Sequence, residues 1–261
     1  MPDSLDPKPT ATLTLQGKVG LVTGAGRGIG AGIAQAFAAA GADVVVNDLA
    51  ESAASIAVCR AIAATGRRAL FCAADVSRED DVARMFSTIA AEFGQLDIMV
   101  NNAGIARHED IFTTSLESWN AVINTHLTGA FLCSREAMRV MRTQGSGRII
   151  QISSVVAHQG AIHGFVHYAA AKSGLLGFTK TLARTAAPFG ITVNAIAPGI
   201  VDSDMLRTTH GSEGVAELAD AVPLGISTAS EIGAAAVYLA GEGARRITGT
   251  VIDVNGGMYF R

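Results

Sequence analysis

The chain has little charge, few cysteines and no long apolar run. Only 16% of its 261 residues are charged, and the formal net charge is −3. A nucleic-acid-binding protein normally carries a basic stripe or patch, whereas the lysines and arginines here are scattered. No apolar run reaches the roughly 20 residues needed to cross a bilayer. We therefore expect neither a nucleic-acid partner nor a membrane partner.

Cysteine usage and the start of the chain both favour a cytoplasmic protein. Cys59, Cys72 and Cys133 lie far apart and are odd in number, which favours buried thiols in a reducing compartment over a disulfide framework. Residues 1–16 are polar, contain three prolines and lack the apolar core of a signal peptide. We expect residues 1–15 to form a polar tail and residues 16–261 to form a single domain.

From residue 18 onward, short apolar runs alternate with longer helical patterns. Near-continuous apolar runs are typical of strands that are covered on both faces. The expected strands are Val19–Thr23, Val44–Asp48, Ala69–Ala73, Asp97–Asn101, Arg148–Ser153, Ile191–Ala197 and Thr250–Val254. The helical segments include Gly28–Ala40, Glu79–Phe93, Leu116–Met141 and Tyr168–Ala187. We predict an α/β fold of the Rossmann type, with a doubly wound, seven-stranded parallel sheet in a three-layer αβα sandwich.

One segment breaks this alternation. Residues 200–226 are polar, mixed and weakly periodic. A long irregular segment in a compact domain is often a lid or a binding loop. We predict that this segment is a substrate lid.

A glycine-rich turn follows the first expected strand. Residues 23–30 read Thr-Gly-Ala-Gly-Arg-Gly-Ile-Gly and lead into a helical pattern. Glycines let backbone amides approach phosphate oxygens, and the amino terminus of a helix supplies partial positive charge. The stretch has neither the G-x-G-x-x-G spacing nor the G-K-S/T ending of a mononucleotide loop. We predict a pyrophosphate site, with a tight packing turn as the alternative, at Gly24, Arg27, Gly28, Ile29 and Gly30.

Asp48 ends the second expected strand, 18 residues after Gly30. An acid at about this spacing is positioned to hold the adenosine ribose hydroxyls. Its charge would repel a 2′-phosphate, so we predict NAD rather than NADP as the cofactor. Arg27 favours NADP instead, because a guanidinium near the ribose can bind a 2′-phosphate. A solvated carboxylate is the alternative interpretation of Asp48.

Two further strand ends suit a dinucleotide. We expect Asp75 and Val76 near the adenine, and the backbone of Asn102, Ala103 and Gly104 against the cofactor. Asx-rich strand ends are also ordinary turn chemistry.

These residues, together with Ser154 and Tyr168-Ala-Ala-Ala-Lys172, resemble the classical branch of the short-chain dehydrogenase/reductase family. The glycine turn matches the family's T-G-x-x-x-G-x-G form, residues 101–104 its N-N-A-G element, and Tyr168 and Lys172 its Y-x-x-x-K motif. The resemblance covers residues 17–257. It implies an oxidoreductase that moves a hydride between a nicotinamide dinucleotide and a secondary alcohol or its ketone.

The resemblance also implies individual roles. Ser154, Tyr168 and Lys172 are the catalytic residues, and Tyr168 and Lys172 contact the cofactor as well. Ser154 orients the substrate oxygen, and strand alternation favours it over Ser153. The loop that holds the nicotinamide is expected to contribute Pro198, Gly199, Val201 and Ser203; on local grounds alone Ser203 is equally a helix cap.

The spacing of Tyr168 and Lys172 has a chemical consequence. Lys172 lies one helical turn after Tyr168, so both side chains share a face. A cation about 4–5 Å from the phenol oxygen favours the phenolate by roughly 3–4 kcal/mol at an effective dielectric near 20. We expect Lys172 to lower the pKa of Tyr168 toward neutrality and to make it a usable base.

The sequence departs from the family pattern at two places. His126 stands where the family commonly has an asparagine that anchors a proton-relay water, so His126 is either a relay group or a satisfied buried histidine. The segment between Ser154 and Tyr168 is one residue longer than in many relatives and carries His158, His163 and His167. No acid or cysteine accompanies these histidines, so we predict no metal site. We expect them to wall the substrate pocket and to recognise a hydroxylated or acidic substrate.

Three functions compete. The first is an NAD(H)-dependent oxidoreductase acting on a small polyol or hydroxy compound. The alternative is an NADPH-dependent 3-oxoacyl-thioester reductase acting on an acyl-carrier-protein or CoA substrate, which shares every motif and against which Asp48 counts. A silent dinucleotide-binding protein is disfavoured, because all three catalytic groups are present. The family often pairs its two long helices, so the resemblance implies a homotetramer or homodimer.

Overall fold

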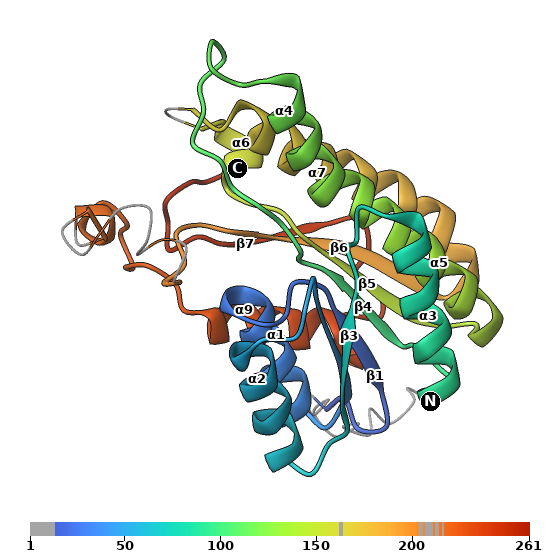
Figure 1. The fold of residues 1–261 in the computed structure, drawn as a ribbon. Helices are drawn as coiled ribbons and strands as arrows, with labels where there is room; N and C mark the ends of the chain where they lie inside the picture. Colours follow the sequence, from blue (N-terminus) through green and yellow to red (C-terminus); the bar gives the residue numbers. More distant parts are fainter. Residues whose placement is uncertain (1–13, 162–163, 204–205, 207–210, 212–213, 216) are drawn as a thin grey trace, which may run out of the picture.

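The protein forms one parallel sheet with helices on both faces (Figure 1). The computed structural model describes residues 14–161, 164–203, 206, 211, 214–215 and 217–261. The strand order is β3-β2-β1-β4-β5-β6-β7, and every pair of neighbours is parallel. The strands are β1 (Val19–Val22), β2 (Asp43–Asp48), β3 (Ala69–Ala73), β4 (Ile98–Asn101), β5 (Gly147–Ile152), β6 (Ile191–Pro198) and β7 (Val251–Val254).

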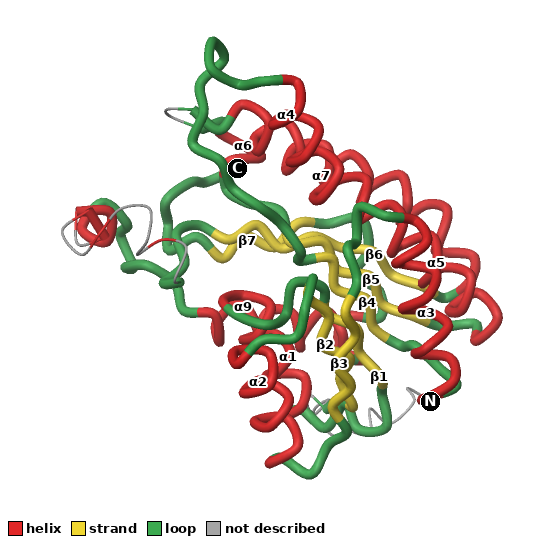
Figure 2. The backbone as a smooth tube through the Cα atoms, in the orientation of Figure 1, coloured by secondary structure: helices red, strands yellow, loops and turns green. Residues whose placement is uncertain are grey.

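The helices divide between the two faces of the sheet (Figures 1 and 2). One core joins α1, α2 and α9 to the sheet through residues such as Phe37, Ile62 and Ile232. The other joins α3, α5 and α7 through residues such as Phe86, Met141 and Ala183. The helices are α1 (Gly28–Ala39), α2 (Ala53–Ala64), α3 (Glu79–Phe93), α4 (Leu116–Ile123), α5 (Gly129–Gln144), α6 (Val156–Gln159), α7 (Val166–Ala186) and α9 (Ala229–Ala240).

This architecture confirms the predicted doubly wound, three-layer αβα fold with seven parallel strands. The strand order reverses between β1 and β4, and doubly wound sheets bind their ligands beyond the carboxyl ends of the strands at such a point. Each expected strand is present with its ends shifted by at most one residue. No helix in the described part of the chain is long and apolar enough to cross a membrane.

The helix predicted over residues 116–141 differs in its hydrogen bonding. Asn124–Thr128 form a turn of π-helix between α4 and α5, although the backbone stays helical at both joints. π-bulges of this kind occur frequently at functional sites. This one carries His126.

Two details of the structure differ from the layout that the sequence suggested. Leu15 is not part of a polar tail: it is 1% exposed, lies in the core, and its N–H donates to the carbonyl of Ala40. The predicted lid is not wholly irregular either, because residues 217–220 are helical. A short helix in a polar segment gives little sequence periodicity, so the sequence did not reveal it.

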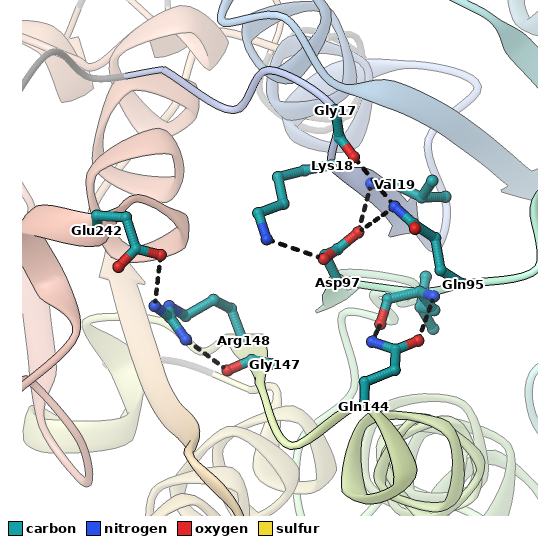
Figure 3. A network of polar contacts seen from close by, with 10 residues as sticks. Gly17, Lys18, Val19, Gln95, Asp97, Gln144, Gly147, Arg148 and Glu242 are labelled. Atoms are coloured by element: carbon teal, nitrogen blue, oxygen red, sulfur yellow. Dashed lines mark hydrogen bonds and ion pairs between the residues drawn. The ribbon is translucent and has the colours of Figure 1, made fainter.

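A polar network links the amino ends of the strands (Figure 3). Asp97 accepts hydrogen bonds from the Lys18 ammonium, the Val19 N–H and the Gln95 amide, which ties the start of β1 to the start of β4. Gln144 pairs with both backbone groups of Leu96. These contacts lie at the amino ends of the strands and leave the carboxyl ends for chemistry.

Candidate active site

The predicted site residues come together at the carboxyl edge of the sheet. Parallel strands point their carboxyl ends the same way, so residues far apart in sequence meet there. The Thr23 hydroxyl shows this directly: it accepts the N–H groups of Asn102 and Ala103, joining the end of β1 to the end of β4. The Val155 N–H donates to the Pro198 carbonyl and joins β5 to β6 in the same way.

The glycine turn has no room for side chains on its inner side. A Cβ at Gly24 would lie 2.9 Å from the Cα of Ala103, and a Cβ at Gly30 would lie 2.3 Å from the carbonyl oxygen of Gly24. Gly28 faces open space and has a φ of +55°, which favours glycine. Arg27, the N-cap of α1, has no side-chain acceptor to cap the first amides of the helix. This open helix amino terminus fits an anion such as a pyrophosphate.

Asp48 lies directly against the glycine turn. A Cβ built on Gly26 would come 2.4 Å from an Asp48 carboxylate oxygen, so only glycine allows this approach. The other carboxylate oxygen accepts the Leu49 N–H at 2.8 Å. Sequence reasoning included Gly26 in the turn but did not identify it as a site residue. Its contact is with a residue 22 positions away, so no local signal could have identified it.

Other predicted cofactor residues already have structural partners. The Asn102 side chain donates to the carbonyls of Thr23 and Gly24, so it holds the turn in shape. The Asp75 carboxylate accepts two hydrogen bonds from Ser77. Val76 is buried and packs against Gly129. Ser203 accepts the Leu206 N–H, as expected for the helix-cap alternative. The described contacts of these side chains are therefore structural.

The nicotinamide loop is closely packed where it leaves β6. A Cβ at Gly199 would lie 2.8 Å from the Cα of Asn255, and the Gly199 N–H donates to Val254. Val201 is 7% exposed and bridges to Ser227. The backbone is therefore fixed at the end of β6 and through the first residues of the predicted lid.

Ser154, Tyr168 and Lys172 form one cluster. Ser154 follows β5, and its hydroxyl accepts the Val156 N–H at 3.2 Å; it lies near enough to the phenol of Tyr168, in the first turn of α7, to lower the pKa of that group. Lys172 is 4% exposed; its Nζ donates to the Ile152 carbonyl at 2.6 Å and lies 5.5 Å from the centre of the Tyr168 ring. The competing serine, Ser153, donates to the Lys172 backbone carbonyl, so it is held away from the phenol.

The electrostatics of this cluster differ from our expectation. Burial raises the pKa of the Tyr168 phenol above its usual value, and the nearby Ser154 side chain offsets part of that rise. Burial also lowers the pKa of Lys172 to about 7. The predicted lowering of the Tyr168 pKa by Lys172 was wrong for this arrangement, because the simple Coulomb argument left out the cost of burying both groups.

His126 packs edge-on against Tyr168. Their ring centres are 5.3 Å apart and the rings are nearly perpendicular. The His126 Nε2 contacts the backbone of Ile105, 2.7 Å from its oxygen and 3.1 Å from its nitrogen. Burial and the nearby charge of Lys172 lower the pKa of His126 to about 3, so the ring is neutral at physiological pH. A Cβ at Gly104 would lie 2.1 Å from the His126 ring, so Gly104 serves packing here.

The histidines between Ser154 and Tyr168 do not cluster. His158 stacks on Tyr259 with ring centres 5.8 Å apart and lies 3.3 Å from an Asp253 carboxylate oxygen. His167 is fully buried and lies 3.5 Å from Glu109. His163 lies outside the described residues. In the described part of the chain, no three histidine, cysteine or acidic side chains are grouped as metal ligands.

Comparison with known proteins defines the class. Residues 24–259 match the family model described as enoyl-(acyl carrier protein) reductase. A solved short-chain type dehydrogenase/reductase from Mycobacterium marinum is 33% identical, with a TM-score of 0.90 over 95% of this chain and 98% of that one. The chain belongs to the short-chain dehydrogenase/reductase family and is an oxidoreductase of the nicotinamide-dependent class.

Two curated relatives are similar over nearly their whole length. The 3-oxoacyl-acyl-carrier-protein reductase FabG of Escherichia coli is 43% identical over 249 residues, which are 95% of this chain and 100% of the relative. The 3-oxoacyl-acyl-carrier-protein reductase of Synechocystis is 41% identical over 248 residues, which are 94% of this chain and 98% of the relative.

Proposed function

We propose that this protein reduces the ketone of 3-oxoacyl thioesters, with a nicotinamide dinucleotide as the hydride donor. The names of its curated relatives support this substrate class better than the polyol or hydroxy compound that we first expected. The observation that carries the reductive chemistry is the cluster of Ser154, Tyr168 and Lys172, in which the pKa of the Tyr168 phenol lies above its usual value.

The state of Tyr168 suits reduction rather than oxidation. Reducing a ketone adds a hydride to carbon and a proton to oxygen, so the enzyme needs a proton donor. A phenol whose pKa is raised keeps its proton throughout the neutral range. An alkoxide is a much stronger base than a phenolate, so it takes this proton readily.

The glycine turn and the three clustered side chains would contribute to the reaction in different ways. The dinucleotide supplies the hydride when bound, and Gly24, Arg27, Gly28, Ile29 and Gly30 would hold its pyrophosphate. Ser154 donates a hydrogen bond to the ketone oxygen and fixes it beside Tyr168. Tyr168 protonates that oxygen as hydride reaches the carbon. Tyr168 is left as a phenolate after this transfer. Lys172, whose Nζ is held by the Ile152 carbonyl, stabilises that phenolate when Nζ carries its positive charge.

Asp48 carries our proposal for the cofactor. Its carboxylate lies against Gly26, next to the open amino terminus of α1, where a 2′-phosphate on the adenosine ribose would meet like charge. We therefore propose NADH rather than NADPH as the preferred donor. Arg27 is exposed beside this position and works in the opposite direction.

The substrate class is tested by following NADH oxidation with acetoacetyl-CoA and longer 3-oxoacyl thioesters. Polyols and hydroxy acids with NAD are the comparison. We expect the thioesters to give the higher kcat/KM, and Tyr168→Phe to lower it by about 10²–10⁴-fold. Faster oxidation of a polyol than reduction of any thioester would overturn the proposed function.

The cofactor is tested by the ratio of kcat/KM with NADH to that with NADPH. Asp48→Asn removes the charge and keeps the shape, and we expect it to move the ratio toward NADPH by at least about tenfold. Asp43→Asn is the matched control, because Asp43 begins the same strand and binds the Arg68 N–H. A wild-type preference for NADPH would refute the cofactor proposal and leave the substrate proposal intact.

We also propose that a second copy of the chain covers a groove between α5 and α7. The groove exposes apolar rings, including Phe131 at 46% and Phe189 at 37%. Arg135 lies over the Phe131 ring and Arg142 over the Phe189 ring, so the arginines rim an apolar floor. The lining residues are Phe131, Arg135, Met138, Arg139, Arg142, Phe178, Leu182, Thr185 and Phe189. Apolar patches of this kind favour a protein partner.

A further inference from the structure

The first turn of α7 places Tyr168 and is capped in an unusual way. Phe165 is the N-cap and Tyr168 the third helical residue, so the Tyr168 N–H has no acceptor within the helix. The Phe165 side chain has no acceptor and makes no capping hydrogen bond. His167 takes this place: its Nδ1 accepts the Tyr168 N–H at 2.9 Å.

This hydrogen bond fixes the proton on the His167 ring. Because Nδ1 accepts, the proton of the neutral ring lies on Nε2. Nε2 is buried and lies 3.5 Å from a Glu109 carboxylate oxygen, which is buried as well; the two atoms are close enough for charge attraction but do not form a hydrogen bond. A negative charge at this position favours the tautomer that carries its proton on Nε2, as carboxylates do for metal-bound and catalytic histidines. The charge of the carboxylate therefore favours the tautomer that the Tyr168 N–H requires.

The backbone of Glu109 reinforces the same joint. Its carbonyl accepts the Phe165 N–H at 2.9 Å. Phe165 has a φ of 58° and is the one described non-glycine residue with a positive φ. A bulky residue persists in that conformation only where its surroundings hold it there. The rings of His108 and Tyr168 pack against Phe165, at 5.0 Å and 6.3 Å between ring centres.

We propose that Glu109 and His167 are positioning residues for Tyr168. His167 fixes the backbone of Tyr168 and hence the place of the phenol against Ser154, while Glu109 holds the His167 ring in the required tautomer. This rests on the proposed function only in taking Tyr168 as the proton donor. Phe165, as the N-cap, offers no side-chain acceptor for the Tyr168 N–H, and His167 supplies that acceptor instead.

Two near-isosteric variants separate the hydrogen bond from packing. His167→Asn keeps an acceptor two bonds from Cβ, where Nδ1 stands, whereas His167→Leu has the same branching with no acceptor. We expect His167→Leu to lower kcat at least about tenfold with KM changed less than about twofold, and His167→Asn to recover most of that loss. Equal kcat for the two variants would overturn the proposal.

The loss should act through Tyr168 alone. In a Tyr168→Phe background, His167→Leu should leave the residual rate unchanged within about twofold, because the group being positioned is absent. A further loss by the full factor would mean a general structural role and would also overturn the proposal. Thermal melting of each variant shows whether it folds. If His167→Leu does not fold, Glu109→Leu takes its place.

Glu109→Leu tests the carboxylate separately. We expect it to lower kcat about threefold or more in the wild-type chain and to have no effect in His167→Asn, where no imidazole needs holding. Similar losses in both backgrounds would contradict the role of Glu109. All rates are taken on whichever ketone the wild type reduces. If thioesters fail and another ketone works, the proposed function fails and the positioning test still stands.

Discussion

The burial of Lys172 makes the stability of the protein depend on pH in a calculable way. Burial lowers the pKa of Lys172 from 10.5 to about 7 in the folded chain. Between these values the unfolded chain binds a proton at Lys172 and the folded chain does not, so the free energy of unfolding rises with pH. Burying Lys172 lowers the free energy of unfolding by about 4 kcal/mol near pH 7 and by about 2 kcal/mol near pH 9, so Lys172 contributes a rise of about 2 kcal/mol over this range.

The measurement compares the wild type with Lys172→Met. Urea unfolding is followed through the single tryptophan, Trp119, at several pH values at one protein concentration. The difference in unfolding free energy, wild type minus variant, should rise by about 2 kcal/mol between about pH 7 and about pH 9. Burial raises the pKa of the thiols of Cys72 and Cys133, but both proteins contain them, so their effect cancels.

Lys180→Met is the matched control, since Lys180 lies in the same helix and is exposed. The difference in unfolding free energy between the wild type and Lys180→Met should not change with pH over the same range. If the Lys172→Met difference is flat within about 0.5 kcal/mol, Lys172 keeps its charge in the folded chain. In that case the hydrogen bond to Ile152 outweighs burial, and Lys172 is a permanent cation beside Tyr168.

Three other predictions follow from close contacts. Gly104→Ala drives a Cβ into the His126 ring and should cost about 1–3 kcal/mol of stability and lower kcat, measured by urea unfolding and steady-state rates; an unchanged midpoint would contradict the packing. Burial lowers the pKa of His126 to about 3, so His126→Asn should leave the shape of the pH–rate profile between about pH 5 and 8 unchanged. If the variant's profile lacks an ionisation that the wild type shows in this range, His126 titrates there and the prediction is wrong. Phe131→Glu should reduce the mass measured by light scattering, whereas Phe112→Glu, at an exposed ring outside the groove, should not; a monomeric wild type would end the dimer proposal.

The strands and the order of the motifs were readable from local sequence. Runs such as Val44–Asp48 are apolar on both faces, and only a strand inside a parallel sheet needs that pattern. The turn over residues 23–30 and the Tyr168–Lys172 spacing are likewise local, because each depends on neighbours within one turn or one helical repeat. The π turn at residues 124–128 was not readable, since its hydrogen bonds differ from those of an α-helix without any change in composition.

The ionisation of the catalytic cluster is a property of the folded chain. The sequence determined which groups are present and that Tyr168 and Lys172 share a helical face. Only tertiary packing decided how deeply Lys172 is buried, and burial reversed the expected direction of the Tyr168 pKa. The contact of Glu109 with His167 joins residues 58 positions apart, in a loop and in the first turn of α7, whose approach no local pattern encodes. Desolvation and long-range contact depend on what the rest of the chain places around a residue, so they exist only once the sheet and its helices have assembled.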